Sequence, residues 1–132
     1  MHDEAPTNIK LHRKSQILEV AFNRANYQLS AEYLRVFSPS AEVKGHGPGQ
    51  EVLQLDKSHV GITGIEAQGN YAIKLIFSDH HDSGIYTWSY LRELGEKQEQ
   101  NWTTYLEKVA EHTANEGLST VKWVTPVPPS KD

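Results

Sequence analysis

The residues best suited to chemistry lie in two short polar segments of the chain. One reads DHHDS and contains a His-x-Asp triplet, formed by His80 and Asp82. This triplet is the near half of the 2-His-1-carboxylate site that binds non-haem iron, and His46 or His112 would supply the second histidine. Three-residue matches often arise by chance, so the competing interpretation is a polar turn in which Asp82 or Ser83 caps the next helix.

The other polar segment, GHGPG, carries His46 between two glycines. Its glycine spacing fits neither of the phosphate-binding patterns GxGxxG and GxxxxGKS/T, and a strand is expected after it, so we predict a flexible loop. If the two segments meet in space, His46, His80 and His81 are the candidates for a divalent metal site. Seven histidines in one chain also cluster without any function. We therefore expect no cofactor and no tightly held metal.

The composition excludes several classes of protein. The chain has 132 residues, no cysteine and a net charge of −4. Disulfides, thiolate metal sites and a cysteine nucleophile are therefore excluded. The basic residues are scattered, which argues against nucleic acid and membrane surfaces as partners. The first residues lack the apolar stretch of a signal peptide, and no segment approaches the ~20 apolar residues of a membrane span, so cytoplasmic localisation is expected.

The first third of the chain predicts three short antiparallel strands after a loose terminus, residues 1–6. Apolar residues there recur at every second position, which is the period of a strand with one face on a core. They are Ile9, Leu11, Leu18, Val20, Phe22, Tyr27 and Leu29. Ser30 is the expected N-cap of a short helix, which ends where Ser38 precedes Pro39.

The middle of the chain predicts a long loop followed by further strands. Residues 38–50 are rich in glycine and proline, which indicates an extended loop. Regular structure is expected again from Val52, with a hairpin turn at residues 68–70. The strand after this turn gives the clearest period-two signal. Together with the early strands it predicts a core of Leu18, Val20, Phe22, Tyr71, Ile73, Leu75 and Phe77.

Two amphipathic helices are expected to complete the fold. The first begins near residues 83–87, and Gly95 ends or kinks it. The second follows from Trp102, Tyr105 and Val109, which are spaced three and four apart. The fold class is therefore α+β, with a mostly antiparallel sheet, a short helix after the third strand and one or two C-terminal helices packed on one side.

We expect a single domain over residues 1–132. Its core spans residues 6–95, a helical extension spans residues 96–116, and a flexible tail spans residues 117–132. The extreme ends, residues 1–6 and 125–132, are expected to lie away from the core.

Two segments of the chain resemble a known family. They read QLSAEYLRVFSPSAEVKGHG, residues 28–47, and YAIKLIFSDHHDSGIYTWSYLREL, residues 71–94. Both resemble the N-terminal domain of gamma-butyrobetaine hydroxylase, in the same order and at a similar spacing. In that family the domain is fused to a 2-oxoglutarate oxygenase domain, attached to P-loop ATPases that handle iron–sulfur clusters, or found alone in bacteria. The resemblance implies the stand-alone bacterial form over residues 6 to about 95, without the activity of the separate oxygenase domain.

The resemblance also implies a metal position that this chain has lost. In the hydroxylases, three cysteines after a Leu-Arg pair and one histidine in an Asp-x-His segment hold a structural zinc. Here Leu34-Arg35 is followed at those positions by Ser38, Ser40 and Val43, and the histidine matches His81. Serine is a poor zinc ligand and valine is none, so we expect no zinc. Hydrogen bonds from Ser38 or Ser40 to His81, with packing by Val43, are expected to join the two segments instead.

These considerations favour a non-enzymatic module that docks a protein partner. The resemblance implies a cofactor-dependent enzyme or an iron–sulfur assembly ATPase as that partner. The alternative is a protein that binds a metal or a small molecule through His46, His80 and His81, and an enzyme of unrecognised type is a third hypothesis. No catalytic residue is assigned, because neither a nucleophile elbow nor an acid–base pair is recognisable. The expected binding surface comprises Ser38, Ser40, Glu42, His46, His80, His81 and Asp82.

Overall fold

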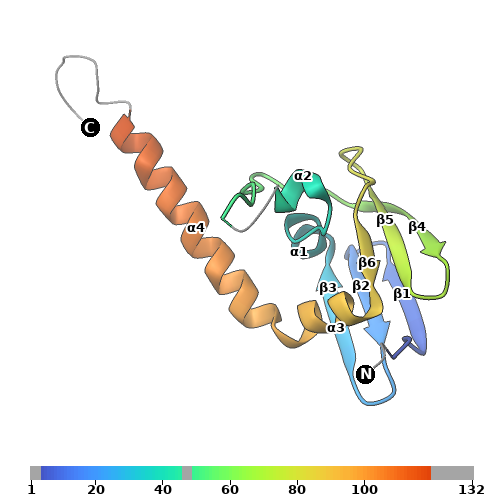
Figure 1. Ribbon diagram of the computed structural model, residues 1–132. Coiled ribbons are helices and arrows are strands. Elements are labelled where there is room, and N and C mark those ends of the chain that lie inside the picture. The colour runs from blue at the N-terminus through green and yellow to red at the C-terminus, as the bar shows by residue number, and fades with distance from the viewer. Residues whose placement is uncertain (1–3, 46–48, 120–132) are drawn as a thin grey trace. The chain divides into compact units, whose positions relative to one another are not determined.

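Figure 1 shows the computed structural model of the chain, in which residues 4–45 and 49–119 are described. The chain divides into two compact units, one that ends at Gln98 and one that begins at Glu99. The first unit contains two three-stranded antiparallel sheets and short helices, so the predicted α+β class is confirmed. The strands are shared between two sheets, whereas the sequence predicted one.

The first sheet is built from the three strands that the N-terminal alternation predicted. They are β1 (Asn8–His12), β2 (Ile17–Ala21) and β3 (Asn26–Ser30). β2 lies in the middle and pairs antiparallel with both neighbours, so that Leu18 stands opposite Leu11 and Leu29. Leu18 and Val20 point to the same face and are completely buried, and Phe22 just beyond the strand is also buried. These three core predictions are correct.

The second sheet follows the order of its strands in the sequence. They are β4 (Ile62–Gln68), β5 (Ala72–Phe77) and β6 (Ile85–Thr87). In the central strand β5, the predicted core residues Ile73, Leu75 and Phe77 are buried. The prediction for Tyr71 is wrong, since this residue is 53% exposed. β5 begins one residue later, and Tyr71 lies in the hairpin turn with Gly69, where the alternation of the strand does not apply.

The predicted loop over residues 38–50 contains a short helix, α2 (Ala41–Lys44). Ser40 starts it by accepting a hydrogen bond from the Glu42 backbone N–H at 3.1 Å. The strand expected from Val52 is absent, and residues 51–61 form neither a helix nor a strand. The Val52 N–H instead donates to the Val43 carbonyl at 2.8 Å, which ties this segment to α2.

The helix predicted after the DHHDS segment is preceded by a strand that the sequence did not reveal. β6 has three residues, too few to display an alternating pattern. Helix α3 (Trp88–Glu96) begins at the end of the predicted range, and its N-cap is Thr87, which accepts from the Tyr90 N–H at 3.2 Å. Neither Asp82 nor Ser83 caps this helix, so that interpretation is wrong.

Three tyrosine hydroxyls, two of them buried and that of Tyr90 half-buried, join α1 (Ala31–Val36) to the β6–α3 region. The last carbonyls of a helix have no partner within the helix and must find donors elsewhere when they are buried. The bonds that meet this need are Tyr86 to the Leu34 carbonyl at 2.6 Å, Tyr90 to the Phe37 carbonyl at 2.6 Å and Tyr33 to the Leu94 carbonyl at 2.7 Å. α1 also begins as predicted, with Ser30 accepting from the Tyr33 N–H at 3.1 Å.

The second unit consists mainly of α4 (Gln98–Ser119), the second amphipathic helix that was predicted. Within it the rings of Trp102 and Tyr105 stack, with centroids 4.8 Å apart. Gly95 lies inside α3 and does not end it. Across the part of the chain that the structure describes, no helix is long and apolar enough to cross a membrane. The predictions for residues 1–3 and 120–132 fall outside the described residues, and residues 4–6 are exposed or half-buried.

Helix α3 packs against β3 at a point where only a hydrogen side chain fits. A Cβ atom added at Gly95 would overlap the ring of Tyr27 on β3. Alanine normally stabilises the interior of a helix by about 1 kcal/mol relative to glycine. Overpacking costs about 1–3 kcal/mol, and here the obstacle is the base of an aromatic ring. The destabilisation from the clash should therefore exceed the gain in helix propensity.

Gly95→Ala is therefore expected to lower the free energy of unfolding by about 1–2 kcal/mol, measured by urea denaturation. The control is the same substitution in a Tyr27→Ala background, where the clash is gone. There it should raise stability by up to about 1 kcal/mol, because only the helix propensity remains. A stabilising effect in the wild-type background would contradict the packing described here.

Candidate functional site

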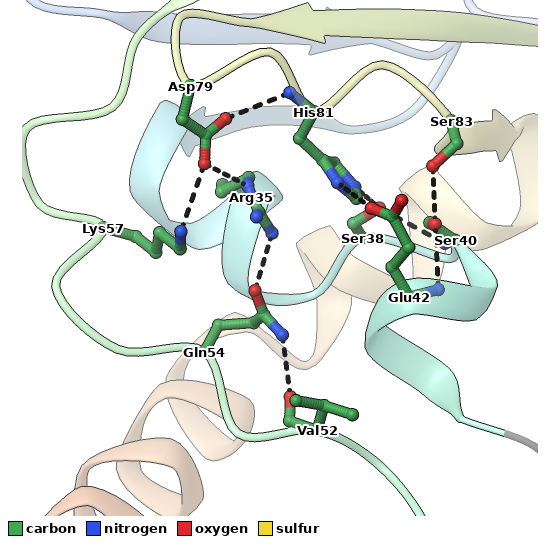
Figure 2. Close-up of polar contacts among 10 residues, drawn as sticks. All are labelled: Arg35, Ser38, Ser40, Glu42, Val52, Gln54, Lys57, Asp79, His81 and Ser83. Carbon is green, nitrogen blue, oxygen red and sulfur yellow. Dashed lines mark hydrogen bonds and ion pairs between the residues drawn. The ribbon is translucent and has the colours of Figure 1, made fainter.

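The two polar segments singled out in the sequence lie side by side in the structure. We call residues 38–43 the serine segment and residues 79–83 the histidine segment (Figure 2). The serine segment begins just after Phe37, the C-cap of α1, and turns into α2. The histidine segment follows β5 in a tight turn, in which His80 has a φ of 69° and its N–H donates to the Phe77 carbonyl at 3.0 Å.

His81 joins the two segments through both nitrogens of its ring. Its Nε2 lies 2.8 Å from the Ser38 hydroxyl, and its Nδ1 lies 2.9 Å from a carboxylate oxygen of Glu42. The predicted hydrogen bond between Ser38 and His81 is therefore present. The bond to Glu42 was not foreseen, although Glu42 had been placed on the same surface.

Ser40 provides a second connection between the segments, to Ser83 and not to His81. The two hydroxyl oxygens are 2.7 Å apart. The Ser40 backbone N–H donates to the Ser38 hydroxyl at 3.2 Å, and the Ser40 hydroxyl accepts from the Glu42 N–H. Figure 2 shows that these bonds run continuously from one segment to the other. Val43 is buried, as a packing role requires.

The His81 ring is buried, with 2% of its side chain exposed. Burial lowers its pKa, and the positive charge of Arg35 acts in the same direction, while the hydrogen bond to Glu42 opposes them; the net pKa is below its usual value. The ring is therefore neutral at neutral pH. It holds the segments together by hydrogen bonds and not by an ion pair with Glu42.

The order Ser38, His81, Glu42 is that of a nucleophile, a general base and an orienting acid. A nucleophile must reach its substrate, but Ser38 has no exposed surface. A Cβ atom at Gly84 would lie 2.5 Å from the Ser38 hydroxyl oxygen, which shows how closely the backbone covers it. In this conformation the trio cannot act on a substrate from solvent, and its role in the fold is to join the segments.

A cluster of charges beside the trio anchors the start of the histidine segment. Arg35 is 7% exposed and donates to Asp79 at 2.9 Å and to Gln54 at 2.9 Å. Lys57 donates to the same carboxylate at 3.2 Å. Burial raises the Asp79 pKa, but the hydrogen bonds from Lys57, Arg35 and the His81 backbone outweigh it and bring the pKa to about 2.

Sequence reasoning missed this cluster, since it interpreted the DHHDS segment, which begins at Asp79, as a polar turn or a metal site. The signal was available in α1, where Arg35 stands between Leu34 and Val36 in an otherwise apolar run. A charged side chain that is carried into a core requires a partner of opposite charge. Distance along the chain concealed that partner, 44 residues away.

The remaining predicted site residues do not form a metal centre. His80 and Asp82 are exposed, His46 lies outside the described residues, and His112 is on α4 in the other unit. Among the residues that the structure describes, no group of three or more His, Asp or Glu side chains is placed to hold a metal. The iron site proposed from His80 and Asp82 therefore gains no support.

The zinc implied by the resemblance does not fit the residues that occupy its positions. Ser38 and Ser40 offer neutral hydroxyls that are already hydrogen-bonded, and Val43 offers no donor atom. Both nitrogens of His81 are engaged by Ser38 and Glu42. A zinc ion would have to displace these bonds without gaining a thiolate in return.

Comparison with known proteins agrees with the resemblance seen in the sequence. The sequence profile described as gamma-butyrobetaine hydroxylase-like, N-terminal, matches residues 9–92. The chain belongs to this family. No curated protein matches the chain.

Solved structures extend this family assignment to the fold. Two solution NMR structures resemble the chain with TM-scores of 0.76 and 0.72, at 46% and 45% identity. The chain covers 89% and 83% of those two proteins, and 85% and 83% of its own length is matched. A crystal structure from Acidithiobacillus ferrooxidans, described as a protein of unknown function in the DUF971 family, has a TM-score of 0.57 at 34% identity. That match covers 68% of this chain and 91% of the other.

The Asp79 cluster makes the stability of the domain dependent on pH. The Asp79 pKa is about 2 in the folded state and close to 3.8 in the unfolded chain. Its contribution is therefore complete above about pH 4 and is lost as the pH falls through 2. Asp79→Asn should reduce the free energy of unfolding at pH 7 by roughly 1–2 kcal/mol, and this difference should shrink steadily between pH 4 and pH 2. Urea denaturation of both proteins across this range provides the measurement, and a pH-independent difference would contradict the ion-pair explanation.

Unlike the cysteine-bearing members of the family, the wild-type protein is expected to retain no stoichiometric zinc after dialysis against EDTA. The reason is that the four family positions offer only one imidazole and no thiolate. Metal content is measured by inductively coupled plasma mass spectrometry. The Ser38→Cys/Ser40→Cys/Val43→Cys variant supplies three thiolates beside His81 and serves as the comparison. One zinc per wild-type chain would overturn this prediction.

Proposed function

We propose that the chain is a non-enzymatic module that docks a protein partner through the surface formed by the serine and histidine segments. The observation that carries this proposal is the separation of roles within the site. The Ser38 hydroxyl and the His81 ring, which could do chemistry, are buried and hydrogen-bonded to each other across the two segments. The Glu42, His80 and Asp82 side chains on the same segments face the solvent.

This arrangement suits recognition because the exposed groups stand on a fixed base. Binding is weakened by the entropy of ordering loops, and loops that are already held in place avoid much of that loss. Here Ser38–His81 and Ser40–Ser83 hold the serine segment, while Arg35–Asp79 holds the histidine segment. Both segments carry polar groups at the surface on connections between longer elements, where partners are commonly bound.

The family context supports a protein as the occupant. By its resemblance, the domain occurs attached to oxygenase domains and to iron–sulfur ATPases, so the proposed partner is a cofactor-dependent enzyme or an assembly ATPase of this kind. The alternative, a metal or small-molecule site on His46, His80 and His81, is weakened because the His81 ring is buried and occupied on both sides.

Site-specific photo-crosslinking in the native host tests the surface directly. A benzophenone amino acid replaces Asp82 in one variant and Asn23 in the control, since both residues are exposed. Asn23 lies in the β2–β3 turn, at the opposite end of the unit from the β5–β6 connection in Figure 1. We expect one discrete protein to be captured from position 82 and not from position 23.

The captured protein is then purified and its affinity measured by calorimetry. It should bind the wild-type chain, and Asp82→Lys should weaken binding at least about tenfold, because a charge at the contact is reversed. Glu66→Lys, a charge reversal on β4, is the matched control and should leave the affinity unchanged. Equal capture from positions 82 and 23, no capture from position 82, or equal affinities of all three chains would refute the proposed surface.

A further inference from the structure

The hydrogen bonds around His81 have a direction, which the donor and acceptor capacities of each group determine. A carboxylate only accepts, so the atom facing Glu42 must be a donor, and that atom is Nδ1 of the ring. A neutral imidazole carries one proton, so a proton on Nδ1 leaves Nε2 as an acceptor. The Ser38 hydroxyl, 2.8 Å from Nε2, must then be the donor.

We propose that Glu42 is a positioning residue that holds His81 in the Nδ1–H tautomer and thereby locks the serine segment onto the histidine segment without a metal. In this arrangement the Ser40 N–H donates to the Ser38 oxygen, the Ser38 hydroxyl donates to Nε2, and Nδ1–H donates to Glu42. Each donor has one acceptor, and the bonds run in a single direction through both segments. This property belongs to the isolated chain and does not depend on the docking of any partner.

The opposite tautomer conflicts with Glu42 and not with Ser38. With the proton on Nε2, the lone pair of Nδ1 would face the carboxylate at 2.9 Å, and two acceptors repel each other. Ser38 could tolerate the reversal, because a hydroxyl can accept a hydrogen bond from Nε2 as well as donate one to it. Glu42 therefore determines which nitrogen of the His81 ring carries the proton.

The position of Glu42 explains how an exposed side chain can control a buried ring. Its side chain is 72% exposed, so its charge remains hydrated and avoids the cost of full burial. Its backbone is fixed, since its N–H donates to the Ser40 hydroxyl, which is itself hydrogen-bonded to the Ser83 hydroxyl. Helix α2 thus places the Glu42 carboxylate beside His81, and the bonds of His81 in turn hold α2 in place.

Nitrogen NMR of the histidine ring tests this assignment in the purified chain. Long-range proton–nitrogen correlation at neutral pH distinguishes a protonated ring nitrogen from a bare one. We expect Nδ1 of His81 to be protonated and Nε2 to be bare in the wild-type protein. A protonated Nε2 with a bare Nδ1, or a doubly protonated ring, would overturn the proposal without any mutant.

Three variants separate positioning from a general loss of charge. Glu42→Leu removes the acceptor, and we expect a mixture of tautomers and roughly a tenfold fall in the equilibrium constant for folding, from a lost bond to a charged group. Glu42→Gln keeps an acceptor oxygen, so Nδ1–H should remain the major form. Glu51→Leu, an exposed glutamate beyond α2, is the matched control and should leave the tautomer unchanged.

Each result bears on the proposal. If Glu42→Leu keeps the pure Nδ1–H tautomer, or if Glu51→Leu disturbs it as much, Glu42 is not the positioning residue. If Glu42→Leu fails to fold, the wild-type spectrum and the Glu42→Gln spectrum still decide the tautomer. Because these measurements use the chain alone, they stand or fall independently of the crosslinking and affinity experiments.

Discussion

A buried neutral imidazole must place both of its nitrogens in hydrogen bonds, and this requirement determines how the serine and histidine segments meet. His81 satisfies it with a hydroxyl and a carboxylate that both come from one other segment, residues 38–42. Either bond alone would leave a buried polar atom unpaired, at a cost of roughly 1–3 kcal/mol. The segment after α1 is therefore held at two points on one ring, which defines its orientation as well as its distance.

The same requirement explains the other polar contacts between distant parts of the unit. Two carbonyls at the end of α1 accept hydrogen bonds from tyrosines of the β6–α3 region, and a carbonyl at the end of α3 accepts one from a tyrosine of α1. Arg35 meets its need for a counter-charge in Asp79, two residues before His81. These contacts converge on the region between α1 and the histidine segment. The exposed side chains of the two segments are thus supported by a layer of satisfied polar atoms and not by apolar packing alone.

The sequence predicted those parts of the fold that depend on local pattern. Alternation located the strands around Leu18 and Leu75, and a hydroxyl before an apolar run located the start of α1 at Ser30. Features that depend on pairing between distant residues were not predictable in this way. β6 is a strand only because Ala72–Lys74 lie beside it, and Tyr71 escapes the core because the turn ends one residue later than the alternation suggested. The contact of Ser38 with His81 was predicted from the family resemblance, whereas Glu42 joined it through the geometry of a four-residue helix that looked like loop.

The connection between the serine and histidine segments contains no sulfur. Thiolates that hold a zinc ion can be oxidised to sulfenic acid and on to disulfides, and each step releases a ligand from the metal. Hydroxyl, imidazole and carboxylate groups do not enter that series of reactions. In this member of the family, the bonds that join the two segments therefore contain no group that peroxide converts along this series.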